Sequence, residues 1–217
     1  MGTFASVSVI VRRRALPTPA MIFPARTHID PTMFTPDLAD RTRQRALRML
    51  RDGAPRREIL TCLVTAAESL AGRGSVASIL VLDKDGLLRN GASPNLPTDY
   101  LDAIDRLRPD ARVGTCAAAA ATGNVVETPD FRADEKWAEL RHLPLALGFA
   151  GAWSMPIRLE DGAVLGTFGT YYRERRRPTT EERDAVGILA SAAAIALSER
   201  AVVPDDDAAS AQGGGRP

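Results

Sequence analysis

The chain has 217 residues, 45% of them hydrophobic, and a formal net charge of +1. This length allows one domain with its own core and flanking tails. The balanced charge gives no broad electrostatic case for nucleic acid or a membrane surface, and no apolar run approaches the roughly 20 residues that span a bilayer.

The two cysteines, Cys62 and Cys116, have no CxxC spacing. A disulfide framework and a zinc site are therefore not indicated, and we expect a reducing compartment. The start of the chain carries its arginines after a short apolar stretch, the reverse of a secretory signal. We predict a cytoplasmic protein without a metal.

The N-terminal part is basic and irregular. Residues 1–37 contain five prolines and no sustained period, which predicts a disordered tail rich in proline and arginine. Residues 1–57 hold eleven arginines against four aspartates, so this part is either a solvated arm or a contact for an anionic partner. Residues 38–54 are typical of a linker helix that ends at Asp52 and Gly53.

A domain begins near residue 55. Apolar residues at three-to-four spacing predict a helix over residues 56–71 whose wide stripe packs against something large. Residues 75–82 are apolar on both faces, which is typical of a central strand. After a turn, residues 87–92 are its hairpin partner, and residues 98–107 form a short helix.

Residues 113–123 read VGTCAAAAATG. Here we expect Thr115 to cap a short helix over residues 116–122 that ends at Gly123. Cys116 would then lie in the first helical turn, where the helix dipole lowers a thiol pKa. A free cysteine is also among the most buried residue types, so packing, ligand contact, redox chemistry and catalysis all remain open.

Two more elements are expected before the last strands. Residues 124–127 are a short strand candidate, and a helix from Glu135 to His142 is broken by Pro144, which opens one more turn ending at Gly148.

The C-terminal part has the clearest signals. Residues 149–157 and 164–172 are two strands joined by a turn. Thr179 and Glu182 have the spacing of a capping box and predict a helix from residue 179 to about 200. Residues 202–217 are expected to be a disordered tail. The order of elements favours an α+β domain with an antiparallel sheet over residues 55–201.

Several stretches in order carry a resemblance: ASPNLPTDYLDAID, VGTCAAAAATGNVVE, FRADEKWAELR, GFAGAWSMPI and LGTFGTYYRERRRPTTEE. Together they resemble the GAF domain, a small sensory module of bacterial signalling proteins. The resemblance implies a six-stranded antiparallel sheet. Terminal helices, often used for dimerisation, cover one face, and short helices and loops roof a ligand pocket on the other.

The resemblance does not identify a ligand or cofactor. Bilin-binding members usually follow the attachment cysteine with histidine, whereas Cys116 is followed by Ala117. The cyclic-nucleotide pattern is matched only in part. Members that reduce free methionine sulfoxide need a second essential cysteine downstream, and none follows Cys116.

The predicted ligand-binding residues follow from the resemblance and from the side chains available there. We expect small, polar and aromatic groups to line the pocket, namely Thr115, Cys116, Trp137, Leu140, Trp153 and Ser154. Trp153 and Ser154 are neighbours on one strand, so their side chains point to opposite faces.

Three functions remain in competition. The preferred hypothesis is a non-enzymatic sensory module that binds an unknown small molecule and signals to a protein partner, as a homodimer through the helices Arg56–Ala71 and Thr179–Arg200. The second is a thiol enzyme of the sulfoxide-reductase kind with Cys116 as nucleophile. The third is a ligand-free dimerisation scaffold whose pocket is closed by Trp137, Leu140 and Trp153.

Overall fold

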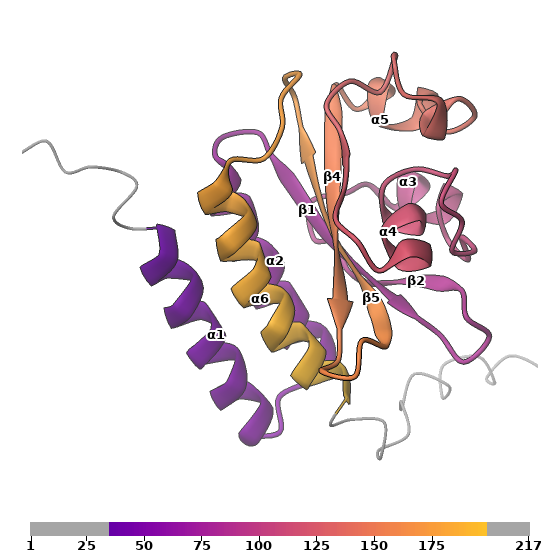
Figure 1. Ribbon diagram of the computed structural model, residues 1–217. Helices are drawn as coiled ribbons and strands as arrows, with labels where there is room; N and C mark the ends of the chain where they lie inside the picture. The colour runs from indigo at the N-terminus through magenta and orange to yellow at the C-terminus, as the bar shows by residue number, and fades with distance from the viewer. Residues whose placement is uncertain (1–34, 199–217) are drawn as a thin grey trace, which may run out of the picture.

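The computed structural model describes residues 35–198, which form three layers (Figure 1). An antiparallel sheet of five strands lies in the middle. Three long helices cover one face, and short helices with connecting loops cover the other. Among these residues, no helix combines the length and the apolar character needed to cross a bilayer.

The sheet has the strand order β2-β1-β5-β4-β3. Its members are β1 (Val76–Leu82), β2 (Leu88–Ala92), β3 (Val126–Thr128), β4 (Gly151–Arg158) and β5 (Val164–Tyr172). The first and last strands of the domain therefore pair at its centre, over the register Val76 to Tyr171 through Val81 to Gly166. All five strands occur where the sequence predicts them, within a few residues at each end.

The expected sixth strand is not formed within residues 35–198, so that part of the prediction is wrong. Where another strand could extend the β2 edge, the chain makes a single bridge between Leu88 and Leu107. Arg106 has a φ of 61°, an uncommon conformation for a side chain of this size, and it turns the backbone away from the strand direction. Pro109, two residues beyond the bridge, has no N–H to donate.

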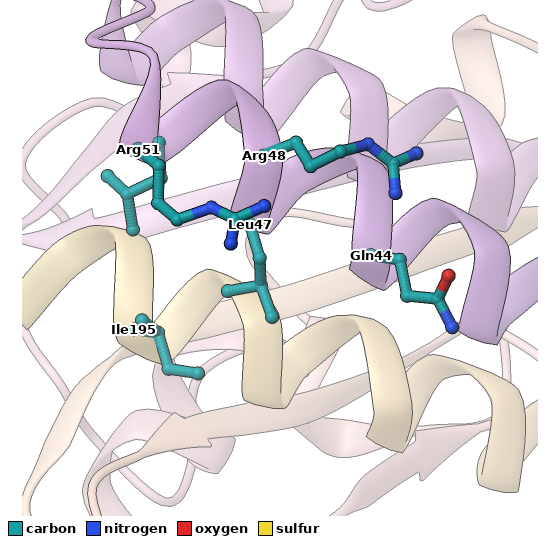
Figure 2. Close-up of a pocket in the computed structure, with 6 residues that line it drawn as sticks. Gln44, Leu47, Arg48, Arg51 and Ile195 are labelled. Atoms are coloured by element: carbon teal, nitrogen blue, oxygen red, sulfur yellow. The ribbon is translucent and has the colours of Figure 1, made fainter.

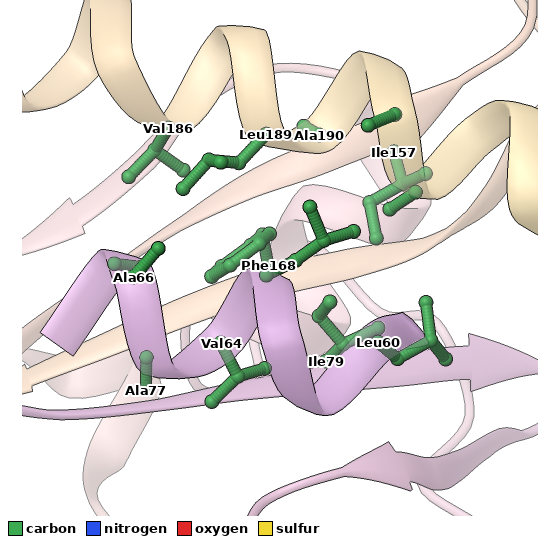
Figure 3. Packing of buried hydrophobic residues seen from close by; sticks show 14 of the residues in the cluster. Leu60, Val64, Ala66, Ala77, Ile79, Ile157, Phe168, Val186, Leu189 and Ala190 are labelled. Atoms are coloured by element: carbon green, nitrogen blue, oxygen red, sulfur yellow. The ribbon is translucent and has the colours of Figure 1, made fainter. Parts of the chain in front are cut away.

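The helical layer consists of α1 (Thr35–Arg51), α2 (Arg56–Ala71) and α6 (Thr180–Ser198). Helices α2 and α6 pack on the sheet, and α1 lies against both of them. Figure 3 shows Phe168 and Ile79 of the sheet between Val64 of α2 and Leu189 of α6. The apolar stripes that the sequence shows on α2 and α6 are thus buried within one chain.

Short elements cover the opposite face: α3 (Thr98–Ala103), α4 (Cys116–Thr122), a 3₁₀ helix (Glu135–Trp137) and α5 (His142–Ala146). Helix α4 has the predicted bounds and ends at Gly123, whose φ of 65° suits glycine.

The predicted helix from Glu135 to His142 is wrong. The Asp134 carboxylate accepts from the backbone N–H of Lys136, which tightens this turn to a 3₁₀ helix. The chain then starts a new helix at His142, and Pro144 is accommodated in its first turn, where no intrahelical N–H is needed.

The start of α6 confirms the predicted capping box. The backbone N–H of Thr179 donates to Glu182 Oε2 at 2.8 Å, and the N–H of Glu182 donates to Thr179 Oγ1 at 3.2 Å. Two N–H groups that the helix itself leaves unpaired are thereby satisfied.

We expect Thr179→Ala to lower the free energy of unfolding by about 1 kcal/mol, because one of these two bonds is lost. Urea unfolding measures the difference. Thr180→Ala, one position further along and exposed, is the matched control and should change stability far less. Equal effects of the two substitutions would contradict a capping role for Thr179.

Candidate functional site

The candidate site lies where α4 meets the sheet. Ser78, Gly169 and Ser154 stand side by side on β1, β5 and β4, and they form a row of small residues across three strands. A Cβ atom on Gly169 would lie only 3.0 Å from Cys116 Sγ and 3.1 Å from Ser78 Oγ. The missing side chain at Gly169 therefore allows Cys116 to rest on the sheet.

Three of the predicted site residues meet at this point. Ser154 Oγ donates a hydrogen bond of 2.8 Å to Thr115 Oγ1, and Cys116 Sγ lies 3.2 Å from the same Ser154 oxygen. Because the single Ser154 proton is directed at Thr115, the thiol acts as donor to Ser154. All three side chains are buried. Thr115 precedes α4 as predicted, but its hydroxyl makes no capping hydrogen bond.

The site stabilises the neutral forms of its titratable groups. Burial raises the pKa of the Cys116 thiol above its ordinary value, although polar contacts with Ser154, Thr167 and Thr115 act in the opposite direction. Burial likewise raises the pKa of Tyr171, whose hydroxyl accepts from Tyr100 at 3.2 Å. Cys116 is thus a protonated thiol at neutral pH, the less reactive form.

Two hydroxyl groups on this face form no well-aligned hydrogen bond among the described residues, although one lies beside the Cys116 thiol and the other beside the Tyr171 hydroxyl. They belong to Ser78 on β1 and Thr167 on β5, and both side chains are fully buried. Thr167 stands two residues before Gly169, on the same face of β5. An unsatisfied buried hydroxyl costs about 1–3 kcal/mol, so its presence calls for an explanation.

A polar chain builds the roof beside this cluster. Trp137 Nε1 donates to Thr128 Oγ1 at 3.2 Å, and that hydroxyl donates to Asp134 Oδ2 at 2.6 Å. Burial alone would raise the pKa of Asp134, but hydrogen bonds from Lys136 and Thr128 outweigh it and hold the pKa below its usual value. The Trp137 ring is in contact range of Gly114, directly before Thr115.

The remaining predicted residues lie on different sides of the sheet. Leu140 is half-buried and packs against the cluster that contains Cys116 and Trp137. Trp153 is fully buried in the other cluster, with Phe168 and Leu189. The structure therefore brings together five of the six predicted residues and leaves Trp153 facing the long helices.

The site residues predicted from the sequence do not include Ser78, Thr128, Asp134, Thr167 or Gly169. A signal was available for three of them, since Ser78 interrupts an apolar strand, and Thr167 and Gly169 belong to the small residues of the LGTFGTYY stretch. The placement of these positions around Cys116 depends on the pairing register of the strands, which no local pattern gives.

A surface groove of about 490 Å³ lies far from this site, between α1 and α6 (Figure 2). Leu47, Leu50 and Ile195 supply its apolar surface, and the side chains of Arg48 and Arg51 border it together with Gln44. Within residues 35–198, no group of three or more His, Cys, Asp and Glu residues is placed to hold a metal ion.

The chain thus places an antiparallel sheet between a layer of long helices and a roof of short helices that covers a small polar cluster. A family model described as GAF domain matches residues 53–198. The chain belongs to the GAF domain family.

The sequence is also similar to that of an individual sensor protein. The chain is 32% identical over 157 residues to a methyl sulfide methyltransferase-associated sensor of Methanosarcina acetivorans. That alignment covers 72% of this chain but only 16% of the relative, so the relative is a much longer protein.

Two solved structures have a similar fold. The first is the GAF domain of a phosphoenolpyruvate-protein phosphotransferase from Coxiella burnetii, with a TM-score of 0.63 and 17% identity, covering 78% of this chain and 95% of that one. The second is the free methionine-R-sulfoxide reductase of Neisseria meningitidis in complex with its substrate, with a TM-score of 0.60 and 15% identity, covering 80% and 95%.

The two thiols should differ in reactivity. Cys62 is half-buried on α2, whereas Cys116 is buried and protonated. We expect iodoacetamide at neutral pH to alkylate Cys62 in the native chain and Cys116 only after unfolding in urea, as peptide mass spectrometry can measure. The Cys62→Ser variant is the control and should stay unmodified until it unfolds. Rapid native labelling of Cys116 would contradict the burial of its thiol.

Proposed function

We propose that this chain is a sensory GAF domain that binds a small uncharged polar molecule between α4 and the sheet. The observation that carries the proposal is the pair of buried hydroxyls on Ser78 and Thr167, neither of which forms a well-aligned hydrogen bond among the described residues. A ligand that hydrogen-bonds to both would remove the free-energy cost of leaving them unsatisfied. The sensor of M. acetivorans supports a sensory role through its sequence similarity.

The chemistry of the site favours an uncharged ligand. The polar groups at hand are the hydroxyls of Ser78, Thr115, Ser154 and Thr167 and a protonated thiol on Cys116. None of them carries a charge that could balance an ionised ligand. Burial of an unpaired ion is strongly unfavourable, whereas a neutral molecule with donors and acceptors matches these groups.

Entry requires α4 to move, because Cys116 rests against the sheet at Gly169. Helix α4 carries five alanines after Cys116, so it contacts β4 and β5 through small side chains. An outward shift of α4 exposes less apolar surface than the same shift of a leucine-rich helix would. The small-residue helix is therefore suited to open and close over a ligand.

A binding role is better supported than catalysis. The Cys116 thiol is protonated, and Cys62, which could otherwise form a disulfide with it, lies on α2 across the sheet. The sheet thus separates the two sulfur atoms. We infer that the chain acts as a sensor rather than as a sulfoxide reductase, although it shares the fold of that enzyme.

A thermal-shift assay of the full chain tests the proposed class of ligand. The chain is heated with uncharged polar metabolites and, separately, with charged analogues of each. We expect stabilisation by an uncharged compound, with loss of the effect in Ser78→Ala and Thr167→Val. Native mass spectrometry of the purified chain should show the same compound if it remains bound.

Thr170→Val is the matched control for this experiment. The Thr170 hydroxyl is also buried and unpartnered among the described residues, but it lies opposite Ala77 and Trp153, on the helix side of the sheet. The control should keep the ligand response. A response to charged compounds alone would overturn the assignment of ligand class, and no response at all would favour the ligand-free scaffold.

We further propose that the signal leaves through a homodimer formed by the outer surfaces of α1 and α6. The inner stripes of α2 and α6 are buried in the core of the chain, which leaves the groove beside Leu47 and Ile195 as the apolar surface available there. Helices α1 and α6 run in the same direction (Figure 1).

Charge complementarity favours a two-fold arrangement of this dimer. Glu181 and Asp184 stand at the start of α6, and Arg48 and Arg51 stand at the end of α1. An antiparallel two-fold pairing would place the acidic start of one protomer against the basic end of its partner. A partner protein that recognises the arrangement of the two protomers would then receive the signal.

Light scattering at tens of micromolar tests this interface. We expect the mass of a dimer for the wild type and of a monomer for Leu47→Asp and Ile195→Asp, because a charge would be buried in the contact. The control is Val125→Asp, at an exposed hydrophobic residue elsewhere. A monomeric wild type, or a Leu47→Asp variant that stays dimeric, would contradict the proposal.

A further inference from the structure

The segment that joins β5 to α6 contains four arginines in the run RERRR, residues 173–177. Each of these arginines contacts a specific part of the same chain. The side chains divide between two layers. Arg173 and Arg175 contact loops on the roof side, Arg177 contacts Glu127 of β3 on the face of the long helices, and Arg176 contacts the ends of α2 and α6.

Arg173 is held between two glycines. A Cβ atom on Gly74 would lie 3.0 Å from Arg173 Cδ, and one on Gly148 would lie 2.9 Å from Arg173 Nη1. The guanidinium donates to the carbonyl oxygen of Leu147 at 2.9 Å and stands 5.0 Å from the centre of the Phe149 ring. Arg173 thereby attaches the roof near Leu147 and Phe149 to the end of β5.

Two further arginines attach β3 and the loop after it. Arg175 Nε lies 3.1 Å from Asp130 Oδ2. Arg177 Nη1 lies 2.7 Å from Glu127 Oε2, while the other oxygen of Glu127 pairs with Arg183 of α6 at 2.7 Å. The next residue of β3 is Thr128, which holds the indole of Trp137 in the roof.

Arg176 contacts the helical layer, at the end of α2 and the start of α6. Its two terminal nitrogens each lie 2.7 Å from a carboxylate oxygen of Glu182, and Nη2 also donates to the carbonyl oxygen of Ala71 at the end of α2. The guanidinium stacks on the Tyr172 ring at 3.6 Å, and the Tyr172 hydroxyl donates to Glu182 at 3.2 Å. One side chain thus connects α2, β5 and α6.

From these contacts we propose that residues 173–177 couple the pocket roof, residues 127–149, to the adjoining ends of α2 and α6. The segment is short, and its side chains bind both layers at once. A displacement of the roof therefore pulls on Arg173, Arg175 and Arg177, and the backbone transmits that displacement to Arg176. Exposed ion pairs are individually weak, so the coupling arises from several contacts on one stretch of backbone.

In the proposed sensor, this coupling carries the effect of ligand binding from the roof to the helical layer. In that respect the inference rests on the proposed function. A ligand that shifts α4 and the roof would alter the start of α6, and with it the acidic residues near the dimer surface. The physical connection itself is a property of the chain and exists without any ligand.

Hydrogen exchange of the full chain, measured by mass spectrometry without ligand, tests the coupling. The helix-side variant is Tyr172→Phe, which removes one hydrogen bond to Glu182 and keeps the ring under Arg176. We expect amides in residues 130–149 to exchange about threefold to tenfold faster, although Tyr172→Phe removes no bond to the roof. Rates are compared with those of β1, which report global opening.

The reverse perturbation is Asp130→Asn, which removes the roof-side partner of Arg175. It should accelerate exchange in the first turn of α6, and the double variant should deviate from the sum of the two single effects. Arg41→Ala is the matched control, because it removes an ion pair with Asp37 confined to α1. It should leave the roof and α6 unchanged.

The proposal is overturned if Tyr172→Phe alters only α2 and α6, if Asp130→Asn alters only the roof, or if the double variant is additive. Since no ligand is present, these outcomes are independent of whether the pocket binds anything. A site that fails every ligand test can still show coupled exchange, and a ligand-binding site can lack it.

Discussion

The buried carboxylate of Glu182 holds the helical layer to the sheet. It accepts hydrogen bonds from Arg176, from the hydroxyl of Tyr172 and from the backbone of Thr179. Removing one of these donors would leave a buried carboxylate oxygen unsatisfied, which typically costs about 1–3 kcal/mol, so the bonded groups are constrained to stay in place. Glu182 thereby connects the start of α6 to β5 and to Arg176, which also binds the end of α2 through the carbonyl oxygen of Ala71.

The central sheet separates two kinds of chemistry. Along β5, Thr167, Gly169 and Tyr171 face the roof, whereas Phe168 and Tyr172 face the long helices. One side therefore offers hydroxyls and space for a close approach, and the other offers a continuous apolar core. The proposed binding on the first side and the proposed transmission on the second require no rearrangement of the strands.

Much of the fold could be predicted because its signals are local. The helix over residues 56–71 has its predicted bounds, since Pro55 and Gly72 flank it, and the Thr179–Glu182 spacing defines the start of α6. The missing sixth strand could not be predicted, because it depends on how Leu107 meets the β2 edge.

Part of the site, like much of the fold, could be predicted from the sequence. Thr115, Cys116 and Ser154 follow from the family resemblance and do meet in space. Ser78 and Thr167 join them only through the strand register, which the sequence does not reveal. The partners of the arginine run were equally hidden, because the carboxylates of Glu127 and Asp130 lie far from it along the chain.

The two tryptophans lie on opposite sides of the sheet. Trp137 donates its indole N–H to Thr128 in the roof, and Trp153 is buried among the residues that face the long helices. The chain thus carries one intrinsic fluorophore in each layer, with the sheet between them. Fluorescence of the single-tryptophan variants Trp137→Phe and Trp153→Phe can therefore distinguish an event at the pocket from one at the helical surface.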